Sequence, residues 1–469
     1  MLICTGCNRR KRRENTNRKF LGQEAQPMKF IDLVWRECCM IGKSILYFAF
    51  LFVLVLSFSS QYAADRASDL ENITSGNRVT INQYGEKSIN PFVEPKETDG
   101  FYGYKMAEVP EQVMPRVAVT LYRECRDNKY ASYPYDFIKW VKLSKDKQER
   151  AGEIFQEITG YTISEYNDIV KKRYQMQQEE ISENGDGNVT IDSTGYYEIP
   201  IAETLSYQQF KERMLELEEM IGPESSYSNL ERYGREEISY EDASKAYDSL
   251  VKKDKVSGAY ARLFCDYMGI FLAIFPAFVA VAYARRDKRA GIRELVNSRQ
   301  LSSVKLIGAR YLALVLMMFL PILVLCIPTT WEIYSMTKPL GLPIDILAFF
   351  KYSIAWLLPT LMFTVSLSYF LTELTQTAIG ILVQVALWFL TLNKTPLVGG
   401  YEWSFFLRHN SIMEYGVYEA GISEIWINRI TYVIVAIGLV LMTSALFARK
   451  RKGRWYGKRR SVKVPLDHQ

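Results

Sequence analysis

The chain has 469 residues, which is enough for two or more folding units, and a net charge of +6 at pH 7. That charge is divided unevenly, because residues 61–260 carry a net charge of −12 and the remaining residues carry one of +18. The positive charge lies beside long apolar runs, so it indicates the orientation of a membrane protein and argues against nucleic-acid binding.

Residues 1–43 are predicted to be a basic cytoplasmic segment that ends in a helix lying at the membrane interface. The apolar face of that helix would comprise Phe30, Ile31, Val34, Trp35 and Cys38. A simple continuation of the first span is the alternative, and Met28 offers a second possible start of the protein. Cys4 and Cys7 have no second cysteine pair, and the chain has only two histidines, so we predict neither a metal site nor a cofactor.

Residues 44–63 are apolar over a length that crosses a bilayer, and we predict the first transmembrane helix there. A cleaved signal peptide is the alternative. Gly42-Lys43-Ser44 matches the end of a phosphate-binding loop, but Glu37 stands where that loop requires its first glycine. The chain therefore has no nucleotide-binding motif of its own, and any ATP hydrolysis would belong to a partner chain.

Residues 64–260 form a polar, acidic block without a span, and we expect a mostly helical α+β domain outside the cytoplasm. Three capping patterns predict helix N-termini, namely Thr162-x-x-Glu165, Ser206-x-x-Gln209 and Ser239-x-x-Asp242. Residues 188–200 read as a small hairpin. Cys125 is the single cysteine between residues 64 and 260, which excludes a disulfide framework inside this block.

Residues 261–448 contain five further apolar runs, so the predicted fold class is a mainly α, polytopic membrane protein with six spans. The runs are at 262–284, 307–327, 346–371, 376–392 and 430–448. Pro276 is predicted to kink the second span. Residues 328–344 are expected to be a short outer loop, and residues 393–427 are expected to lie partly in the outer leaflet.

Two polar side chains inside the spans are candidates for a transport pathway, because buried polar groups in a membrane usually have a function. They are Asp266 in the second span and Gln384 in the fifth. For Asp266 a position at the membrane interface, close to Arg262 one helical turn away, is the favoured alternative.

Residues 285–306 form a charged loop between the second and third spans. Seven residues between 285 and 305 are Lys or Arg, which marks this loop as cytoplasmic. Ile292, Leu295 and Val296 recur near helical spacing, so we expect an amphipathic helix over 287–303 that docks against a partner. A solvated loop whose charges only orient the protein is the alternative. Six spans would place both termini, and the basic tail at 449–469, in the cytoplasm.

The stretch RDKRAGIRELVNSRQLSSVKLIGARYLAL resembles the loop that precedes the third span in membrane subunits of ABC export systems of the second type. The matching positions are Gly291, Glu294, Leu295, Ser298, Arg299 and Ser302. The segments RHNSIMEYG and INRITYVIV are similar to the closing part of the same family. The resemblance covers the spans and loops, whereas the block of roughly 200 residues after the first span departs from many members.

This resemblance implies a permease in the plasma membrane, built as a homodimer or heterodimer and driven by a separate ABC ATP-binding subunit. Closure of that subunit would push on the loop and shift the spans. The implied docking residues are Arg289, Gly291, Ile292, Arg293, Glu294, Leu295, Val296 and Arg299. Export of a peptide, a lipid-like compound or a drug would be the expected activity.

Two other classes of function stay open at this point. A transmembrane signalling or mechanical-coupling protein would use the outer domain as its working part, with nothing crossing the membrane. A membrane enzyme is disfavoured, because the chain contains neither HExxH nor GxSxG and lacks paired carboxylates within its spans.

Overall fold

The computed structural model describes residues 29–64, 76–81, 85, 87–133, 138–183, 199–298 and 301–452. The chain divides into two compact units, Asp69–Lys253 and Met1–Ser68 with Asp254–Gln469, which we call the polar unit and the membrane unit. Several predictions fall outside the described residues. They concern the Cys4/Cys7 pair, most of the hairpin at 188–200, Arg299 and the tail beyond Lys452.

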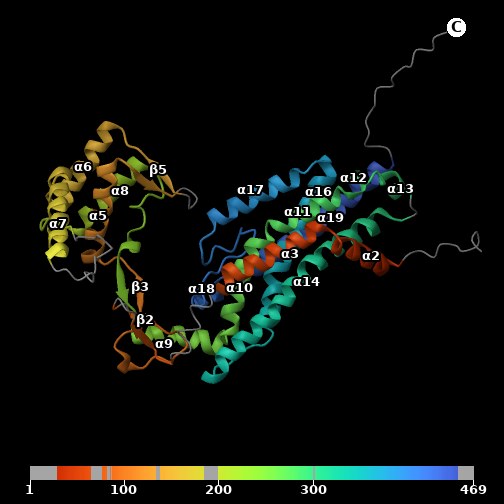
Figure 1. The fold of residues 1–469 in the computed structure, drawn as a ribbon, viewed down its shortest axis with the longest axis horizontal. Helices are drawn as coiled ribbons and strands as arrows, with labels where there is room; N and C mark the ends of the chain where they lie inside the picture. Colours follow the sequence, from red (N-terminus) through yellow and green to blue (C-terminus); the bar gives the residue numbers. More distant parts are fainter. Residues whose placement is uncertain are drawn as a thin grey trace, which may run out of the picture. The chain divides into compact units, whose positions relative to one another are not determined.

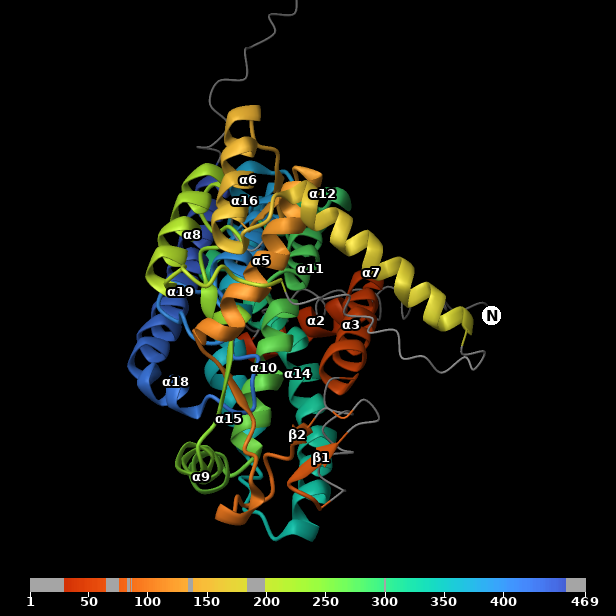
Figure 2. The same ribbon diagram turned by 90° about the vertical axis from the view of Figure 1, so that its left-hand side faces the viewer.

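The polar unit is mostly helical, and its helices between residues 110 and 221 surround one apolar core (Figures 1 and 2). Its helices are α5 (Pro110–Asp127), α6 (Lys145–Thr159), α7 (Ile163–Glu183), α8 (Tyr207–Ile221) and α9 (Tyr240–Asp248), with short turns at Glu97–Asp99, Leu230–Tyr233 and Ser249–Lys253. Antiparallel pairs join β1 (Val79–Ile81) to β2 (Lys87–Ile89), β3 (Tyr104–Met106) to β6 (Arg235–Glu237), and β4 (Tyr130–Ser132) to β5 (Lys139–Val141). Each of α5, α6 and α8 buries apolar residues along one face, and these three helices pack together in the core. Leu121, Phe155 and Phe210 are examples, one from each helix.

The three predicted helix starts are confirmed. The Thr162 hydroxyl accepts a hydrogen bond from the N–H of Glu165 at 3.2 Å, while the Glu165 carboxylate accepts from the N–H of Thr162 at 2.8 Å. Ser206 caps α8 in the same reciprocal way, and Ser239 accepts from the third residue of α9. These side chains satisfy backbone donors that the first helical turn leaves free, so local sequence is sufficient to determine the starts.

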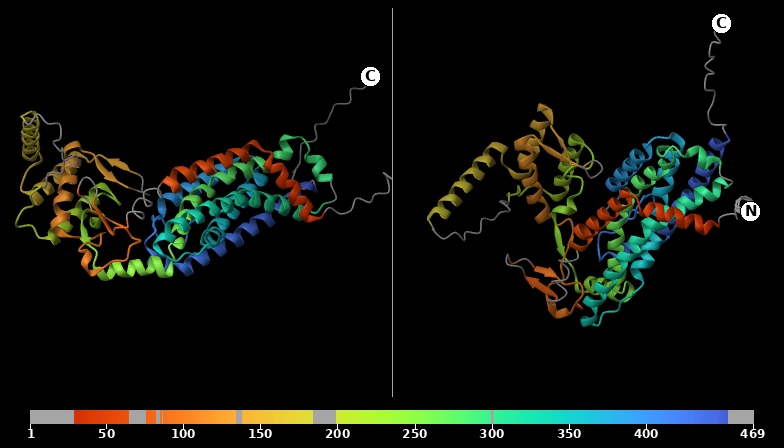
Figure 3. Two further views of the ribbon diagram at one scale, coloured as in Figure 1. Left: turned by 60° about the horizontal axis from the view of Figure 1, so that its bottom comes forward. Right: turned by 45° about the vertical axis from the view of Figure 1, so that its right-hand side comes forward.

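The membrane unit is a bundle of long apolar helices (Figure 3). Its elements are α2 (Phe30–Gly42), α3 (Ile45–Ser57), η1 (Phe58–Ala63), α10 (Ser257–Leu272), α11 (Phe275–Ala284), α12 (Arg286–Arg289), α13 (Arg293–Ser298), α14 (Ser303–Thr337), η6 (Lys338–Leu340), α15 (Ala348–Tyr352), η7 (Ser353–Leu357), α16 (Leu358–Thr375), α17 (Ile379–Lys394), α18 (Tyr415–Ala420) and α19 (Ile422–Arg451). Among the described residues, five helical stretches are long and apolar enough to cross a membrane, and the predicted fifth span, α17, is a shorter apolar helix. The chain is thus a mainly α, multi-pass membrane protein.

Pro276 interrupts the second span, as predicted, and divides it into α10 and α11. The break frees backbone carbonyls that apolar surroundings would leave without partners. Side chains of α17 donate hydrogen bonds to two of these carbonyls. The amide of Gln384 donates to the carbonyl of Ala273 at 2.7 Å, and the indole of Trp388 donates to that of Ile270 at 3.0 Å. Gln384 therefore stabilises the broken helix.

The third span is longer than predicted, because α14 runs without interruption through Pro321 and Pro328 to Thr337. The outer loop expected at 328–344 is consequently wrong over its first ten residues. The missing N–H of Pro321 leaves the carbonyl of Met317 without its helical donor, and the hydroxyl of Tyr47 donates to it at 3.0 Å. Membrane helices tolerate an internal proline when a neighbouring group satisfies the freed carbonyl in this way.

Candidate functional site

The loop that carries the predicted docking residues consists of two short helices, α12 and α13, and the expected single helix over 287–303 is wrong. Gly291 lies between them with a φ of +65°, a conformation that favours glycine and does not continue a right-handed helix. The N–H of Ile292 returns to the carbonyl of Asp287 at 3.1 Å, which closes the turn. The loop thus changes direction at Gly291.

Most of the predicted docking residues lie on the surface of this loop. Ile292 is 41% exposed and Leu295 is 62% exposed, whereas Val296 is 8% exposed and faces inward. Arg289, Gly291 and Glu294 are also exposed. The side chain of Arg293 and the whole of Arg299 lie outside the described part of the chain. Two apolar side chains and two opposite charges are therefore presented together.

A buried group of charges, which we call the ion cluster, joins this loop to two other elements. It consists of Glu37, Tyr283, Arg286, Asp287 and Arg310. Glu37 of α2 is 3% exposed and pairs with Arg286 at 3.0 Å and with Arg310 of α14 at 3.4 Å. Arg310 pairs in turn with Asp287 at 2.7 Å, and the hydroxyl of Tyr283 donates to Glu37. Two carboxylates thus balance two guanidinium groups, of which Arg310 is buried and Arg286 is 26% exposed, and buried charges require such pairing.

The C-terminal helix holds the other end of the same loop. Arg451 of α19 donates to the backbone carbonyl of Leu301 at 2.6 Å. Its neighbour Lys450 pairs with Glu373 at 3.2 Å, which joins α19 to the end of α16. Figure 1 shows α2, α12 and α13 at the end of the bundle where α19 finishes. A displacement of the loop would therefore act on α2, α14 and α19 together.

Sequence reasoning did not single out Glu37, which pairs with both arginines of the ion cluster. The sequence contained a signal, because the buried side of α2 is formed by Leu33, Val34, Glu37 and Ile41 at helical spacing. Of the face predicted from sequence, Ile31 and Trp35 are 77% and 70% exposed. The face of α2 that is buried against α14 therefore differs from the apolar face that was predicted from sequence.

At the opposite end of the bundle, Asp266 has partners other than the one expected. Its carboxylate is buried, pairs with Arg408 at 3.2 Å and accepts from the N–H of His409 at 2.6 Å. Arg262, the expected neighbour, pairs instead with Asp254 at 2.5 Å. Asp266 therefore pairs with a residue 142 positions away in the chain and not with Arg262, and its position relative to the membrane interface stays a prediction.

That segment, residues 395–414, packs into the bundle, and the expectation that residues 393–427 lie partly in the outer leaflet stays a prediction. Tyr401, Phe405 and Phe406 are buried, although Trp403 is 90% exposed. Arg429 of α19 is 2% exposed and donates to the backbone carbonyl of Ser404 at 2.9 Å. A buried guanidinium needs several acceptors, and polar backbone of an irregular segment supplies them here.

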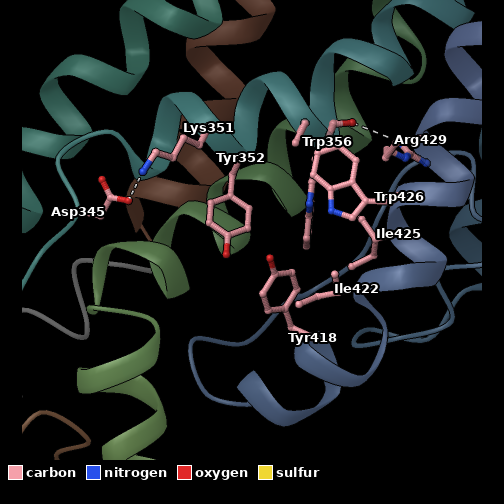
Figure 4. Close-up of a pocket in the computed structure, with 10 residues that line it drawn as sticks. Asp345, Lys351, Tyr352, Trp356, Tyr418, Ile422, Ile425, Trp426 and Arg429 are labelled. Carbon is pink, nitrogen blue, oxygen red and sulfur yellow. Dashed lines mark hydrogen bonds and ion pairs between the residues drawn. The ribbon is translucent and has the colours of Figure 1, made fainter.

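A cavity of about 340 Å³ opens beside this segment, between η7 and the start of α19 (Figure 4). Aromatic side chains dominate its lining, namely Tyr352, Trp356, Tyr418 and Trp426. In Figure 4 the side chains of Tyr352 and Tyr418 face one another across the opening. The ion pair between Lys351 and Asp345, 2.6 Å long, lies at one edge. The size and the apolar lining with few polar groups are typical of a small-molecule site.

Within the described residues, no group of three His, Cys, Asp or Glu side chains is placed to hold a metal ion. The charged clusters pair internally, and their arrangement suits mechanical connection between helices.

Comparison with protein families gives one match, to the family described as ABC-2 family transporter protein, over residues 126–414. The match covers more than half of the chain and includes α10 to α17 of the membrane unit. It also takes in residues 126–253 of the polar unit. Comparisons with curated proteins and with solved structures gave no match.

Proposed function

The chain belongs to the ABC-2 transporter family, and from this premise we propose that it is an exporter permease whose separate ATPase subunit docks on residues 285–306. Members of this family are membrane permease subunits of ABC transporters. The main support for this docking site is that Ile292 and Leu295 are exposed on a loop whose position the ion cluster fixes. Apolar side chains rimmed by charges are typical of protein interfaces.

The ion cluster gives this docking site a route to the spans. ATP binding in the partner would displace α12 and α13, and the pairs from Arg286 to Glu37 and from Asp287 to Arg310 would carry that displacement to α2 and α14. Paired buried charges resist separation, because each charge left alone in an apolar site costs several kcal/mol. The helices would therefore move with the loop.

Orientation follows the distribution of charge. We place the loop, both termini and the tail at 449–469 in the cytoplasm, because Lys and Arg concentrate there. The acidic polar unit then lies outside the cytoplasm, and the protein lies in the plasma membrane as a homodimer or heterodimer of permease subunits. Asp266 and Gln384 would maintain the shape of the pathway region, since both are engaged in hydrogen bonds to backbone groups.

We place the last contact of the transported compound before its release in the aromatic cavity of Figure 4. Tyr352, Trp356 and Tyr418 offer an apolar, aromatic wall that suits a compound with an apolar body. The compound would leave from this end of the bundle in an exporter of the proposed orientation.

A pull-down of the full chain from native membranes is the primary test, and we expect an ATP-binding subunit to be recovered with it. The purified pair is then reconstituted, and ATP hydrolysis and transport are measured together. Hydrolysis coupled to transport supports a permease. If ATP hydrolysis responds to ligands of the polar unit but no transport occurs, the result would support the signalling function instead. If the pull-down recovers no ATPase, the result would contradict the docking proposal.

A further inference from the structure

A second cavity of about 510 Å³ lies at the end of the bundle that carries the ion cluster. Its walls are the end of α2, the start of α3, the end of α11 and α12. The lining changes along its length. Ile45, Leu46, Val279 and Ala282 form an apolar part, whereas Arg286 and Arg289 lie where α11 passes into α12. The cavity is thus amphipathic, with its cationic part at the membrane boundary predicted by sequence.

One of the two arginines at this cavity has no ion-pair partner within the part of the chain that the structure describes. Glu37 and Asp287 neutralise Arg286 and Arg310 within the ion cluster. Arg289 is exposed and forms no ion pair with any described residue. Arg289 is therefore available to bind an anion that is not part of the protein. It lies near Arg286, whose position is determined by its ion pairs with Glu37 and Asp287.

The wall of the cavity that α3 forms is exposed, whereas Val279 of α11 is buried. Ile45 is 83% exposed, and only 22% of the apolar stretch formed by α3 and η1 is buried. An acyl chain can therefore reach this wall from the bilayer without displacing protein. A free phosphate ion would meet the same arginines but would leave the apolar walls unused.

We propose that this cavity binds one anionic phospholipid, with its phosphate between Arg286 and Arg289 and an acyl chain against Ile45 and Leu46. Arginine suits this role, because its planar guanidinium group binds phosphate through two parallel hydrogen bonds. Basic pockets between membrane helices on the cytoplasmic side have the chemistry for such headgroups. The leaflet concerned follows from the proposed orientation, and the lipid would join α2 and α3 to the loop that receives the ATPase.

The test uses the purified full chain in a neutral detergent and measures the binding of three probes. They are dioctanoyl phosphatidylglycerol, dioctanoyl phosphatidylcholine and inorganic phosphate. We expect the phosphatidylglycerol to bind most tightly. Arg289→Gln should weaken its binding about fivefold, because one arginine near an anionic lipid contributes ~1 kcal/mol. Lys288→Gln is the matched control, since it removes the same charge from an exposed neighbour that does not line the cavity, and its effect should stay under about twofold.

Three results would overturn the proposal. Equal losses in Arg289→Gln and Lys288→Gln would show a general charge effect, and equal affinity for phosphatidylcholine would remove the role of the anion. Inorganic phosphate binding as tightly as phosphatidylglycerol would show an ion site without a lipid. None of these measurements involves the ATPase, so failure here is distinct from failure of the docking proposal.

Discussion

Glu37 and Arg286 are 249 positions apart in the chain, and their side chains lie 3.0 Å apart in the structure. The contact joins α2, which precedes the first span, to α12, which follows the second. Since Glu37 also pairs with Arg310, one carboxylate connects three helices at the end of the bundle where the ATPase is proposed to dock.

Glu37→Ala should destabilise the membrane unit by about 3 kcal/mol, because Arg286 and Arg310 each lose one carboxylate partner and then share Asp287 alone. The measurement is thermal unfolding of the full chain in detergent. Asp32→Ala is the control, since it removes an exposed carboxylate from the same helix. Equal losses for the two variants would show that Glu37 has no special role.

Ile292→Asp combined with Leu295→Asp should abolish co-purification with the ATPase while leaving membrane insertion intact. The double change places charges on the exposed apolar positions of the loop, so an interface there would have to bury unpaired carboxylates. Leu215→Asp is a matched control, because Leu215 is 61% exposed in the polar unit and Leu295 is 62% exposed. Unchanged recovery of the ATPase with the double variant would exclude docking at this loop.

Tyr47→Phe should destabilise the protein by about 1 kcal/mol, because the carbonyl of Met317 loses its hydrogen bond. Pro321→Ala should be less harmful in the Tyr47→Phe background than alone, since the alanine N–H can then satisfy the same carbonyl. A double-mutant cycle on thermal unfolding in detergent measures this coupling. Strictly additive effects would contradict our account of how α14 accommodates Pro321.

The free energy of unfolding of the polar unit should fall as the pH rises through and above the ordinary pKa of a glutamate side chain. Burial raises the pKa of Glu124, against hydrogen bonds from Tyr227, the Ala131 N–H and Ser226 that lower it. A raised pKa means that the folded state holds the proton more tightly than the unfolded state. Stability is therefore greatest below the unfolded pKa and is lost as pH rises through the folded one.

Hydrogen exchange of peptides from α5 and β4 in the full chain, corrected for the intrinsic pH dependence of exchange, measures this effect. Glu124→Gln should flatten the pH dependence, because glutamine carries no titrating proton at that position. Persistence of the full dependence in this variant would assign it to another group.

Sidedness has a direct test through single cysteines at exposed positions. In intact cells, a membrane-impermeant thiol reagent should label Leu215→Cys and should not label Lys288→Cys. After the cells are opened, both should react, since both positions are exposed in the structure. Labelling of Lys288→Cys from outside would reverse the orientation and withdraw the proposed docking site.

Local features of the fold could be predicted because their causes lie within a few residues. The caps at Thr162, Ser206 and Ser239 depend on contacts three positions away, and the break at Pro276 depends on one missing N–H. The path of α14 through Pro321 could not be predicted. The carbonyl of Met317, which Pro321 leaves without a donor, accepts a hydrogen bond from Tyr47, and these two residues are 270 positions apart. Local signals at prolines therefore indicate where a helix can break, and neighbouring helices decide whether it does.

By itself, the sequence determined that this is a multi-pass membrane protein with a charged loop between its second and third spans, because apolar length and the placement of lysine and arginine are local properties. Only the tertiary structure decided which charges meet. Asp266 pairs with Arg408 and not with Arg262, and Glu37 pairs with Arg286 and Arg310. In an apolar interior each charge must find a partner, and that partner is selected by helix packing across the chain rather than by proximity in the sequence.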